Sequence, residues 1–336
     1  MPLDVIVLVV VAGLFAIVSG MNDGGAILAT GLKLPTVRPA TGILTLVAMV
    51  ALIPLATHQV ALTFVNRLAT FHDPGGRYAM TIAVICSLAV VLVLSAKGRP
   101  TSLTLAIVGG LTGAGLGWGL PVSAGSVALV LGFGLAAPVV GALVAWAVTL
   151  LLLRLANARS LPSWHRVAFI VQCVAYAAND GQKMLAVFII AIGTTDLAPS
   201  TTTLTANVDL GTTALTTDLG LGTTALTAAL FGLGALYGLP KAGRLLSREI
   251  IVSRPLHGVA AELATGSAVI ASAAASMPVS MTQTVAGALI GAGMTQGGGR
   301  VRWYAAVKIV TAWLLTLPAS ALLAGITAWT AKAAIP

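Results

Sequence analysis

Long apolar runs dominate the chain and are separated by short polar stretches. A run of about 18 or more apolar residues can cross the hydrocarbon core of a bilayer as a helix. Runs of roughly this length lie at 3–19, 40–57, 79–96, 127–153, 166–192, 226–239, 256–275 and 303–329. The pattern predicts an all-α integral membrane protein.

Two shorter apolar pieces, near 101–118 and 281–296, interrupt this pattern. Both are rich in Gly, Ser and Thr, and both follow a proline. They are too short to cross a bilayer comfortably. We expect each to be a broken or re-entrant helix, which is tolerated at membrane depth only where it is buried in protein or lines a cavity.

Four features recur in the same order in the two halves of the chain. They are an Asn-Asp pair (22–23 and 179–180), a Pro-x-Ser-x-Thr segment (100–104 and 278–282), a glycine run (109–115 and 287–293) and a later proline (138 and 318). An ordered recurrence of this kind indicates internal duplication. We expect two inverted repeats whose broken or re-entrant helices meet at a midplane substrate site, since transporters with broken helices are often built this way.

The duplication also predicts how the chain is divided. We expect residues 1–153 to form the first transmembrane repeat, 154–165 a cytoplasmic linker, and 166–336 the second transmembrane repeat. A Thr-rich, low-complexity stretch near 196–225 has acidic residues but neither Lys nor Arg. Because basic residues favour cytoplasmic loops, we expect this stretch to be an extramembrane linker on the opposite side.

Composition narrows the class of protein. Of 336 residues, 58% are hydrophobic and only 8% charged, against about 25% charged in soluble domains. The net charge of +9 could suggest nucleic acid, but the basic residues cluster between apolar spans, as at cytoplasmic edges and lipid headgroups. We therefore expect a multi-pass protein of the cell (plasma) membrane, with no nucleic-acid partner.

Catalytic and cofactor-binding patterns are missing from the sequence. No Walker-type loop is present, and none of the four histidines lies near a convincing Ser or Cys partner. Cys86 and Cys173 lie in apolar stretches without metal-ligand spacing. Residues 5–18 could pass for a signal peptide, but they lack a basic start, so we expect a retained first helix. The chain is predicted not to be an enzyme and to need no cofactor.

The Asn-Asp pairs are the first candidate site. An Asp at the centre of a spanning helix costs about 2.5–3.5 kcal/mol, so an intramembrane Asp is usually functional. Carboxylate and amide oxygens can replace the water shell of a small cation. Asp23 and Asp180, with Asn22 and Asn179, are therefore predicted to bind a coupling ion, sodium or a proton. The alternative is an ion pair between Asp180 and Lys183, which share a helix face.

The Pro-x-Ser-x-Thr segments are the second candidate site. Proline is favoured in the first turn of a helix, where Ser and Thr satisfy free amides. Helices beginning at Thr101 and Val279 would aim N–H groups at mid-membrane, an arrangement that binds anions. The hydroxyls that could donate to a tetrahedral oxyanion are those of Ser102, Thr104, Ser280 and Thr282. The alternative is that these hydroxyls only bond back to helix carbonyls.

Glu262 lies in an apolar stretch of the second half. Such a carboxylate could serve the path of the coupling ion, or it could pair with a nearby Arg at the membrane interface. Both interpretations remain open at this stage.

These motifs resemble those of the inorganic phosphate transporter family, often called PiT. The stretch Ala177-Ala-Asn-Asp-Gly-Gln-Lys183 is similar to that family's Asn-Asp-Gly-Gln-Lys signature. Residues 258–262 and 276–282 resemble its second block. The first half resembles the family at 20–23 and 100–104, so the similarity spans nearly the whole chain.

The resemblance implies secondary active transport of inorganic phosphate by sodium or proton symport, and a homodimer. It implies phosphate contacts at Thr101, Ser102, Thr104, Ser280, Thr282, Asn22, Asn179 and Gln182. It implies coupling-ion contacts at Asp23, Asp180, Asn22, Asn179 and Glu262. If the ion is sodium, Asp23 and Asp180 would be its metal ligands.

The chain departs from the family pattern at a few positions. The family usually has Asn where this chain has Ala26, and His where it has Leu105 and Gln283. These changes could alter the number of coupling ions or the substrate, so a sulfate permease of the same fold is the alternative function. Sulfate has no proton to donate, whereas protonated phosphate can donate to Asp23 or Asp180, which favours phosphate. A passive channel is a further alternative, but interrupted helices favour alternating access.

Overall fold

A computed structural model describes residues 3–32, 34–57, 59–63, 75–97, 101–193, 220–249 and 254–334. This part of the chain is almost entirely helical. The first half contains α1 (Leu3–Ser19), η1 (Gly20–Gly24), α2 (Gly25–Gly31), α3 (Pro39–Ala56), α4 (Gln59–Leu62), α5 (Gly76–Ala96), α6 (Leu103–Trp118) and α7 (Ala124–Leu155). The predicted all-α class is confirmed.

The second half has a similar order of longer helices, with the short helix η4 added between its last two. It contains α8 (Leu161–Tyr176), η3 (Ala177–Gly181), α9 (Gln182–Gly193), α11 (Gly220–Glu249), α12 (Pro255–Ala274), α13 (Met281–Met294), η4 (Gly298–Arg300) and α14 (Trp303–Ala334). The apolar runs of the sequence coincide with these helices, and the run 166–192 spans α8, η3 and α9 in succession. A backbone in lipid must satisfy its own hydrogen bonds, which favours helices.

The length and surface of the helices identify a multi-pass membrane protein. Six helices of the described residues are long and apolar enough to cross a membrane. The two longest, α7 and α14, expose large apolar side chains such as Leu143, Leu151 and Leu322. Exposure of so many apolar side chains to water would be unfavourable, whereas contact with lipid tails carries no such cost.

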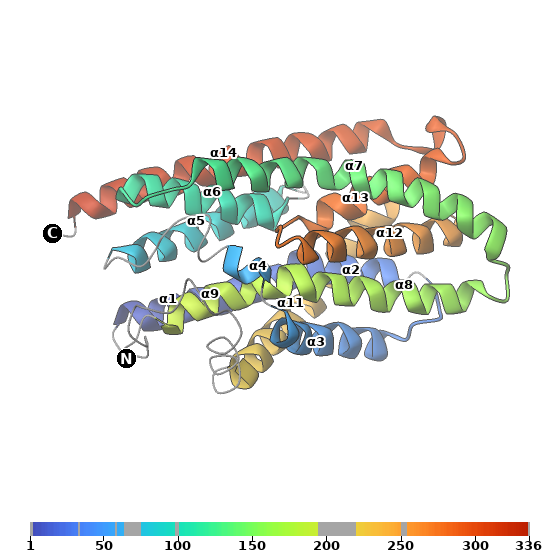
Figure 1. Ribbon diagram of the computed structural model, residues 1–336, viewed down its shortest axis with the longest axis horizontal. Helices are drawn as coiled ribbons and strands as arrows, with labels where there is room; N and C mark the ends of the chain where they lie inside the picture. Colours follow the sequence, from blue (N-terminus) through green and yellow to red (C-terminus); the bar gives the residue numbers. More distant parts are fainter. Residues whose placement is uncertain are drawn as a thin grey trace.

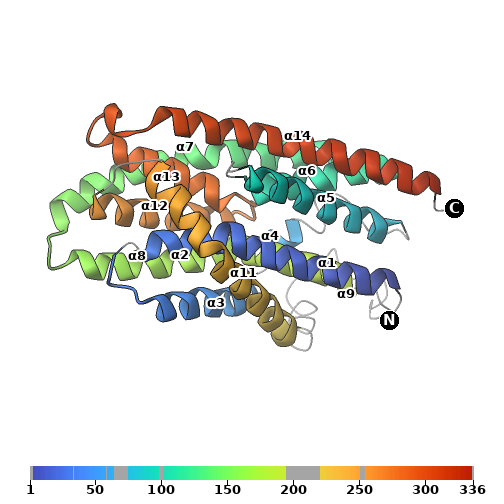
Figure 2. The same ribbon diagram turned by 180° about the vertical axis from the view of Figure 1, so that it is seen from behind.

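The helices of the two halves pack in matching pairs. Helix α6 lies along α14, and α13 lies along α7; α5 packs on α6 as α12 packs on α13 (Figure 1). Matching helices run in opposite directions: α1–α2 leads away from the end of the bundle that holds the N-terminus, and α8–α9 leads back toward it (Figure 1, and from behind in Figure 2). Opposite directions are what an inverted repeat requires.

Glycines set the close crossings of α13 with α7 and of α6 with α14. On α13, a Cβ atom on Gly287 would lie 1.9 Å from the carbonyl oxygen of Pro138 on α7. On α6, a Cβ on Gly113 would lie 2.0 Å from the carbonyl oxygen of Ala321 on α14. Membrane helices approach this closely only where small residues face each other. The duplicated glycine runs thus hold α6 and α13 against the longest helices.

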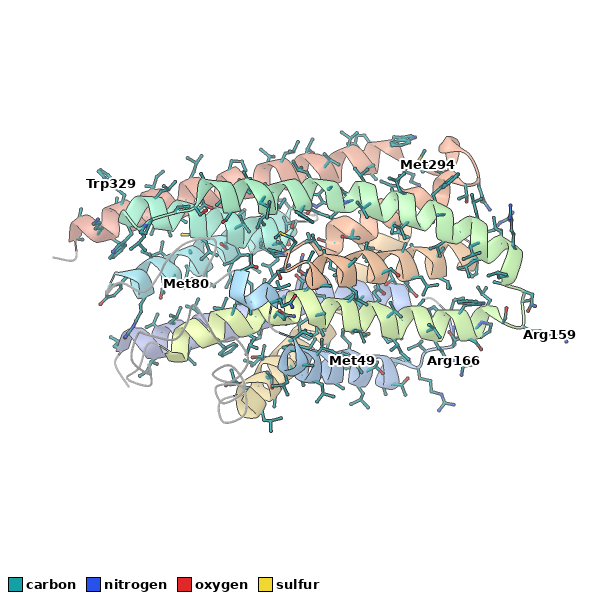
Figure 3. The ribbon with its side chains drawn as sticks, in the orientation of Figure 1. Met49, Met80, Arg159, Arg166, Met294 and Trp329 are labelled. Atoms are coloured by element: carbon teal, nitrogen blue, oxygen red, sulfur yellow. The ribbon has the colours of Figure 1, made fainter. Side chains whose placement is uncertain are left out.

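Several basic side chains lie at one end of the bundle. Arg159 and Arg166 lie at the end opposite Trp329 (Figure 3). Arg38 and Arg254 precede the first turns of α3 and α12, which begin at that same end (Figure 1). This end therefore gathers basic side chains.

Two predicted linkers can be compared with the helices. The segment 154–165 contains the last residues of α7 and the first residues of α8. Of the Thr-rich segment, residues 194–219 lie outside the described residues. Residues 220–225 belong to the first turns of α11. Its apolar Gly-Leu-Gly-Thr-Thr-Ala sequence continues the apolar run that follows it.

Candidate functional site

Each Asn-Asp pair lies in its own π-helical turn, and each turn is part of a longer helix. Asn22 and Asp23 belong to η1, between α1 and α2, and Asn179 and Asp180 belong to η3, between α8 and α9. A π-turn widens the helix and often marks a functional site. No feature of the sequence predicted these turns, because the apolar pattern runs through them without a break.

The Pro-x-Ser-x-Thr segments lead into the first turns of α6 and α13. Helix α6 begins at Leu103 and α13 at Met281, two residues later than predicted in each half. The serines before them are the N-cap residues, and Ser102 Oγ accepts a hydrogen bond from the Leu105 amide at 3.2 Å. The Ser102 hydroxyl oxygen thus satisfies a free amide in the first turn of α6.

The two segments meet, although 178 positions separate them in the sequence. Thr104 Oγ1 donates to the Val279 carbonyl at 3.2 Å, and Thr282 Oγ1 donates to the Thr101 carbonyl at 3.5 Å. Thr104 and Thr282 hold the same position in the two motifs, as do Thr101 and Val279, so the two bonds are equivalent. The starts of α6 and α13 therefore face each other near the middle of the bundle and lead toward opposite ends (Figure 1).

Each asparagine ties its π-turn to the segment of its own half. Asn22 Nδ2 donates to Asp23 Oδ1 at 2.9 Å and to the Thr101 carbonyl at 3.4 Å. Asn179 Oδ1 accepts from the Val279 amide at 3.3 Å, and its Nδ2 donates to the Met277 carbonyl at 3.2 Å.

The two π-turns and the starts of α6 and α13 form one cluster of polar groups. It contains a buried ion pair from the second half of the chain. Lys183 Nζ lies 2.8 Å from Asp180 Oδ1, and both side chains are almost fully buried. The ammonium also donates to Thr104 Oγ1 at 2.8 Å and to the Val279 carbonyl at 2.5 Å. The alternative left open for Asp180 is thus present, and Lys183 is a central residue of the site that was missing from the predicted ligands.

Further polar and apolar groups surround the ion pair. Asp23 is within electrostatic range of Asp180 and Lys183. The hydroxyl of the fully buried Tyr176 is near both carboxylates and has no hydrogen-bond partner in the described part of the chain. A narrow cavity beside the pair is lined by Phe15, Ser19, Leu103, Thr104, Ile107, Asp180 and Lys183.

Gln182 was predicted to contact phosphate, but its side chain bonds to the segment that contains α4. Its Oε1 accepts from the amides of Val60 and Ala61 at 2.8 and 3.2 Å, and its Nε2 donates to Thr57 Oγ1 at 2.8 Å. The free amides belong to the first turn of α4. Both ends of the Gln182 side chain are therefore engaged in holding α4 against α9.

Glu262 is also separated from the cluster. Its Oε2 lies 3.6 Å from His165 Nε2, and His165 in turn contacts Thr36 through Nδ1. Because His165 precedes Asp180 by 15 residues, about 22 Å of helix separates them. The sequence suggested an arginine or the ion path as the partner of Glu262, and a histidine on α8 lies beside it.

Replacing Gln182 with Ala tests its observed role. We expect the free energy of unfolding to fall by about 1–3 kcal/mol, because two buried amides lose their acceptor. The KM for the transported anion should change by less than about twofold, because Gln182 does not face the cluster. Thermal unfolding and uptake kinetics measure the two effects.

Gln283→Leu is the matched control for stability. Gln283 is equally buried, but its Oε1 has no hydrogen-bond partner within the described residues, so its loss should cost less. A large rise in KM in Gln182→Ala, with unchanged stability, would restore Gln182 as a ligand.

Known proteins resemble this chain in sequence and in fold. Residues 164–324 match the model of the phosphate transporter family. A "Probable low-affinity inorganic phosphate transporter" of Bacillus subtilis is 25% identical over 96% of this chain and 95% of its own length. The Mycobacterium leprae protein of the same description is 28% identical over 69% of this chain and 55% of its own length.

One solved structure, "The sodium-dependent phosphate transporter", superposes with a TM-score of 0.79 at 17% identity, over 99% of this chain and all of that one. At this identity the superposition shows a shared fold. The chain is thus similar to the phosphate transporter family in sequence over residues 164–324, and it shares a fold with one solved phosphate transporter over nearly its whole length.

Proposed function

We propose that the protein is a secondary active transporter that moves inorganic phosphate across the plasma membrane by symport with sodium or protons. One observation carries the proposal: two π-turns with Asn-Asp pairs and the starts of α6 and α13 form one buried, hydrogen-bonded cluster. The relatives named as phosphate transporters agree with it.

The anion would bind between the starts of α6 and α13. Free amides and the positive ends of two helix dipoles favour a negative ligand there. Thr101 Oγ1 is fully buried and lacks a hydrogen-bond partner within the described residues. Ser280 Oγ and Thr282 Oγ1 lie 3.0 Å apart and form a pair of hydroxyls. These groups can donate to the oxygens of phosphate.

The coupling ion would bind near Asp23. Its carboxylate accepts a hydrogen bond from the Asn22 amide, whereas the carboxylate of Asp180 accepts one from the Lys183 ammonium. A cation next to a bound anion makes both less costly to hold in a medium of low dielectric. This mutual stabilisation is the physical basis of symport.

The duplicated architecture suggests how the protein could alternate between its two open states. We infer that residues 1–153 and 166–336 are inverted repeats that move relative to each other around the shared cluster, as in other transporters of this kind. Opposite directions of matching helices support this. The basic end of the bundle would face the cytoplasm. A homodimer, expected from the family resemblance, completes the proposal.

Transport by the purified protein in liposomes tests the proposal. Labelled phosphate and labelled sulfate would each be offered under an imposed sodium gradient and then under a proton gradient, with protein-free liposomes as control. Concentrative phosphate uptake under one gradient is expected and names the coupling ion. Uptake of sulfate alone would replace the substrate, and a non-saturating flux without a gradient would indicate a channel.

Thr101→Val tests the anion site. Valine keeps the shape of threonine but removes its hydroxyl. We expect the KM for phosphate to rise about tenfold or more, since a hydrogen bond to a charged group contributes about 1.5–3 kcal/mol. Stability should not fall, because the hydroxyl has no partner to lose within the described residues.

The matched control is Thr149→Val on α7. Thr149 is as buried as Thr101, but its Oγ1 donates to the Ala145 carbonyl of its own helix. We expect an unchanged KM in this variant. An unchanged KM in Thr101→Val as well would remove Thr101 from the binding site.

A further inference from the structure

The surroundings of Lys183 Nζ have the chemistry of a small cation site. A carboxylate oxygen of Asp180, the hydroxyl oxygen of Thr104 and the carbonyl oxygen of Val279 lie within 2.8 Å of the ammonium. These are the hard oxygen ligands that alkali and alkaline-earth ions prefer. They come from both halves of the chain, so the ammonium joins the repeats at their contact.

All three ammonium protons are used by these oxygens. A lysine ammonium has three donors and no acceptor, and each of the three hydrogen bonds goes to the protein itself. In this arrangement Lys183 has no proton left to donate to a bound anion. Its role is that of a cation among oxygen ligands.

The first half contains the same oxygens but has no amine. The positions that correspond to Asp180, Thr104 and Val279 in the duplicated motifs are Asp23, Thr282 and Thr101. Thr282 Oγ1 lies 3.5 Å from the Thr101 carbonyl, and the Asn22 amide reaches both this carbonyl and Asp23 Oδ1. These three oxygens are therefore gathered in one place.

Position 183 itself corresponds to Ala26 in the first half, three residues after the respective aspartate. Alanine offers neither charge nor donor. The duplicated site is thus chemically unequal: one half has a permanent internal cation, and the other has the same ligand types without one.

We propose that the Lys183 ammonium is a built-in substitute for a sodium ion at Asp180, and that its counterpart formed by Asp23, the Thr101 carbonyl and Thr282 binds a mobile sodium ion. This rests on the proposed function for its place in transport. The protein then needs one mobile cation where a symmetric pair of sites would take two.

Lys183→Ala tests the proposal, because it reproduces Ala26 in the second half. The full-length protein would be purified in detergent, and its unfolding temperature measured in sodium chloride and in choline chloride of equal ionic strength. We expect sodium to raise the unfolding temperature of Lys183→Ala by at least about 2 °C more than that of the wild type, because a ligand that binds the folded state stabilises it.

Lys332→Ala is the matched control. Lys332 is another lysine of the helical bundle, and its Nζ donates to the Trp118 carbonyl at the far end of α14. Its replacement should leave the response to sodium as in the wild type. A sodium response of Lys183→Ala that is no larger than that of Lys332→Ala overturns the proposal.

The reciprocal variant Ala26→Lys decides the case if Lys183→Ala does not fold. An ammonium at position 26 should displace the mobile ion, so the stabilisation of the wild type by sodium should disappear. Retention of that stabilisation, or its absence from the wild type, contradicts the proposed first-half site.

Transport gives an independent reading. In liposomes, Lys183→Ala should show a steeper dependence of phosphate uptake on sodium concentration, with a Hill slope larger by about one, because a second ion must bind. An active Lys183→Ala with the wild-type slope argues against the proposal. If the wild type takes up no phosphate under any gradient, the proposed function fails, whereas the unfolding measurements still decide the role of Lys183.

Discussion

Replacing Asp23 with Asn is expected to lower coupled phosphate uptake at least about 100-fold, which corresponds to about 2.7 kcal/mol, while the protein stays folded in the membrane. Asparagine has nearly the volume of aspartate, and Asp23 is buried beside Asn22, within electrostatic range of Asp180. Removing one of two neighbouring negative charges does not disturb the packing. It removes the charge that would hold the coupling ion.

The measurement is uptake of labelled phosphate in liposomes under the coupling gradient, with the unfolding temperature as a check on folding. Wild-type uptake by Asp23→Asn would contradict the mechanism. Loss of uptake together with loss of the folded protein would indicate a structural role instead.

The matching change at Asp180 should have a second consequence. Asp180→Asn leaves the Lys183 ammonium buried without its carboxylate, and breaking one side of a buried ion pair costs about 3–5 kcal/mol. We therefore expect Asp180→Asn to lose both transport and stability. Replacing Lys183 with Met in the same molecule should recover much of the stability. Equal stability of Asp23→Asn and Asp180→Asn would show that the ion pair contributes little.

Gly287→Ala is expected to prevent folding. The new Cβ would lie 1.9 Å from the Pro138 carbonyl oxygen. Both groups belong to helix backbones that cannot move aside without separating α13 from α7. Overpacking of a close contact by backbone displacement is among the most costly substitutions, above about 4 kcal/mol. Because α13 begins at the site, its displacement would also separate Ser280 and Thr282 from Thr101.

Gly132→Ala on α7 is the matched control. A Cβ at Gly132 has no atom within 4 Å, so alanine should be neutral or stabilising by up to about 1 kcal/mol through its higher helix propensity. The yield of monodisperse protein and its unfolding temperature measure both variants. Similar behaviour of Gly287→Ala and Gly132→Ala would show that the α13–α7 crossing is looser than the glycine contact indicates.

The helices and their breaks followed from the sequence because lipid leaves the backbone few alternatives. An apolar run of sufficient length must close its own hydrogen bonds as a helix, and the helices α3, α5, α7 and α14 lie where the runs predicted them. The two short pieces likewise became α6 and α13. Both helices begin two residues later than predicted, with Ser102 and Ser280 at their N-cap positions.

The sequence also placed the polar residues of interest in two duplicated motifs, since charged and amide side chains stand out against an apolar background. The structure brings Asn22, Asp23, Asn179, Asp180 and the threonines of both segments into one cluster. Their roles as ligands stay predictions until transport is measured.

The hydrogen-bond and ion-pair partners of the polar groups became known only from the tertiary structure. Gln182 bonds amides about 120 positions earlier in the chain, and Glu262 lies beside His165. Lys183 reaches from the second half of the chain to Thr104 in the first. Local spacing could suggest the Asp180–Lys183 pair, because both lie on one helix. The other pairs arise where distant helices happen to present free amides or hydroxyls. A buried polar group must satisfy its bonds with whatever the packing places beside it, and that neighbour is a property of the whole bundle.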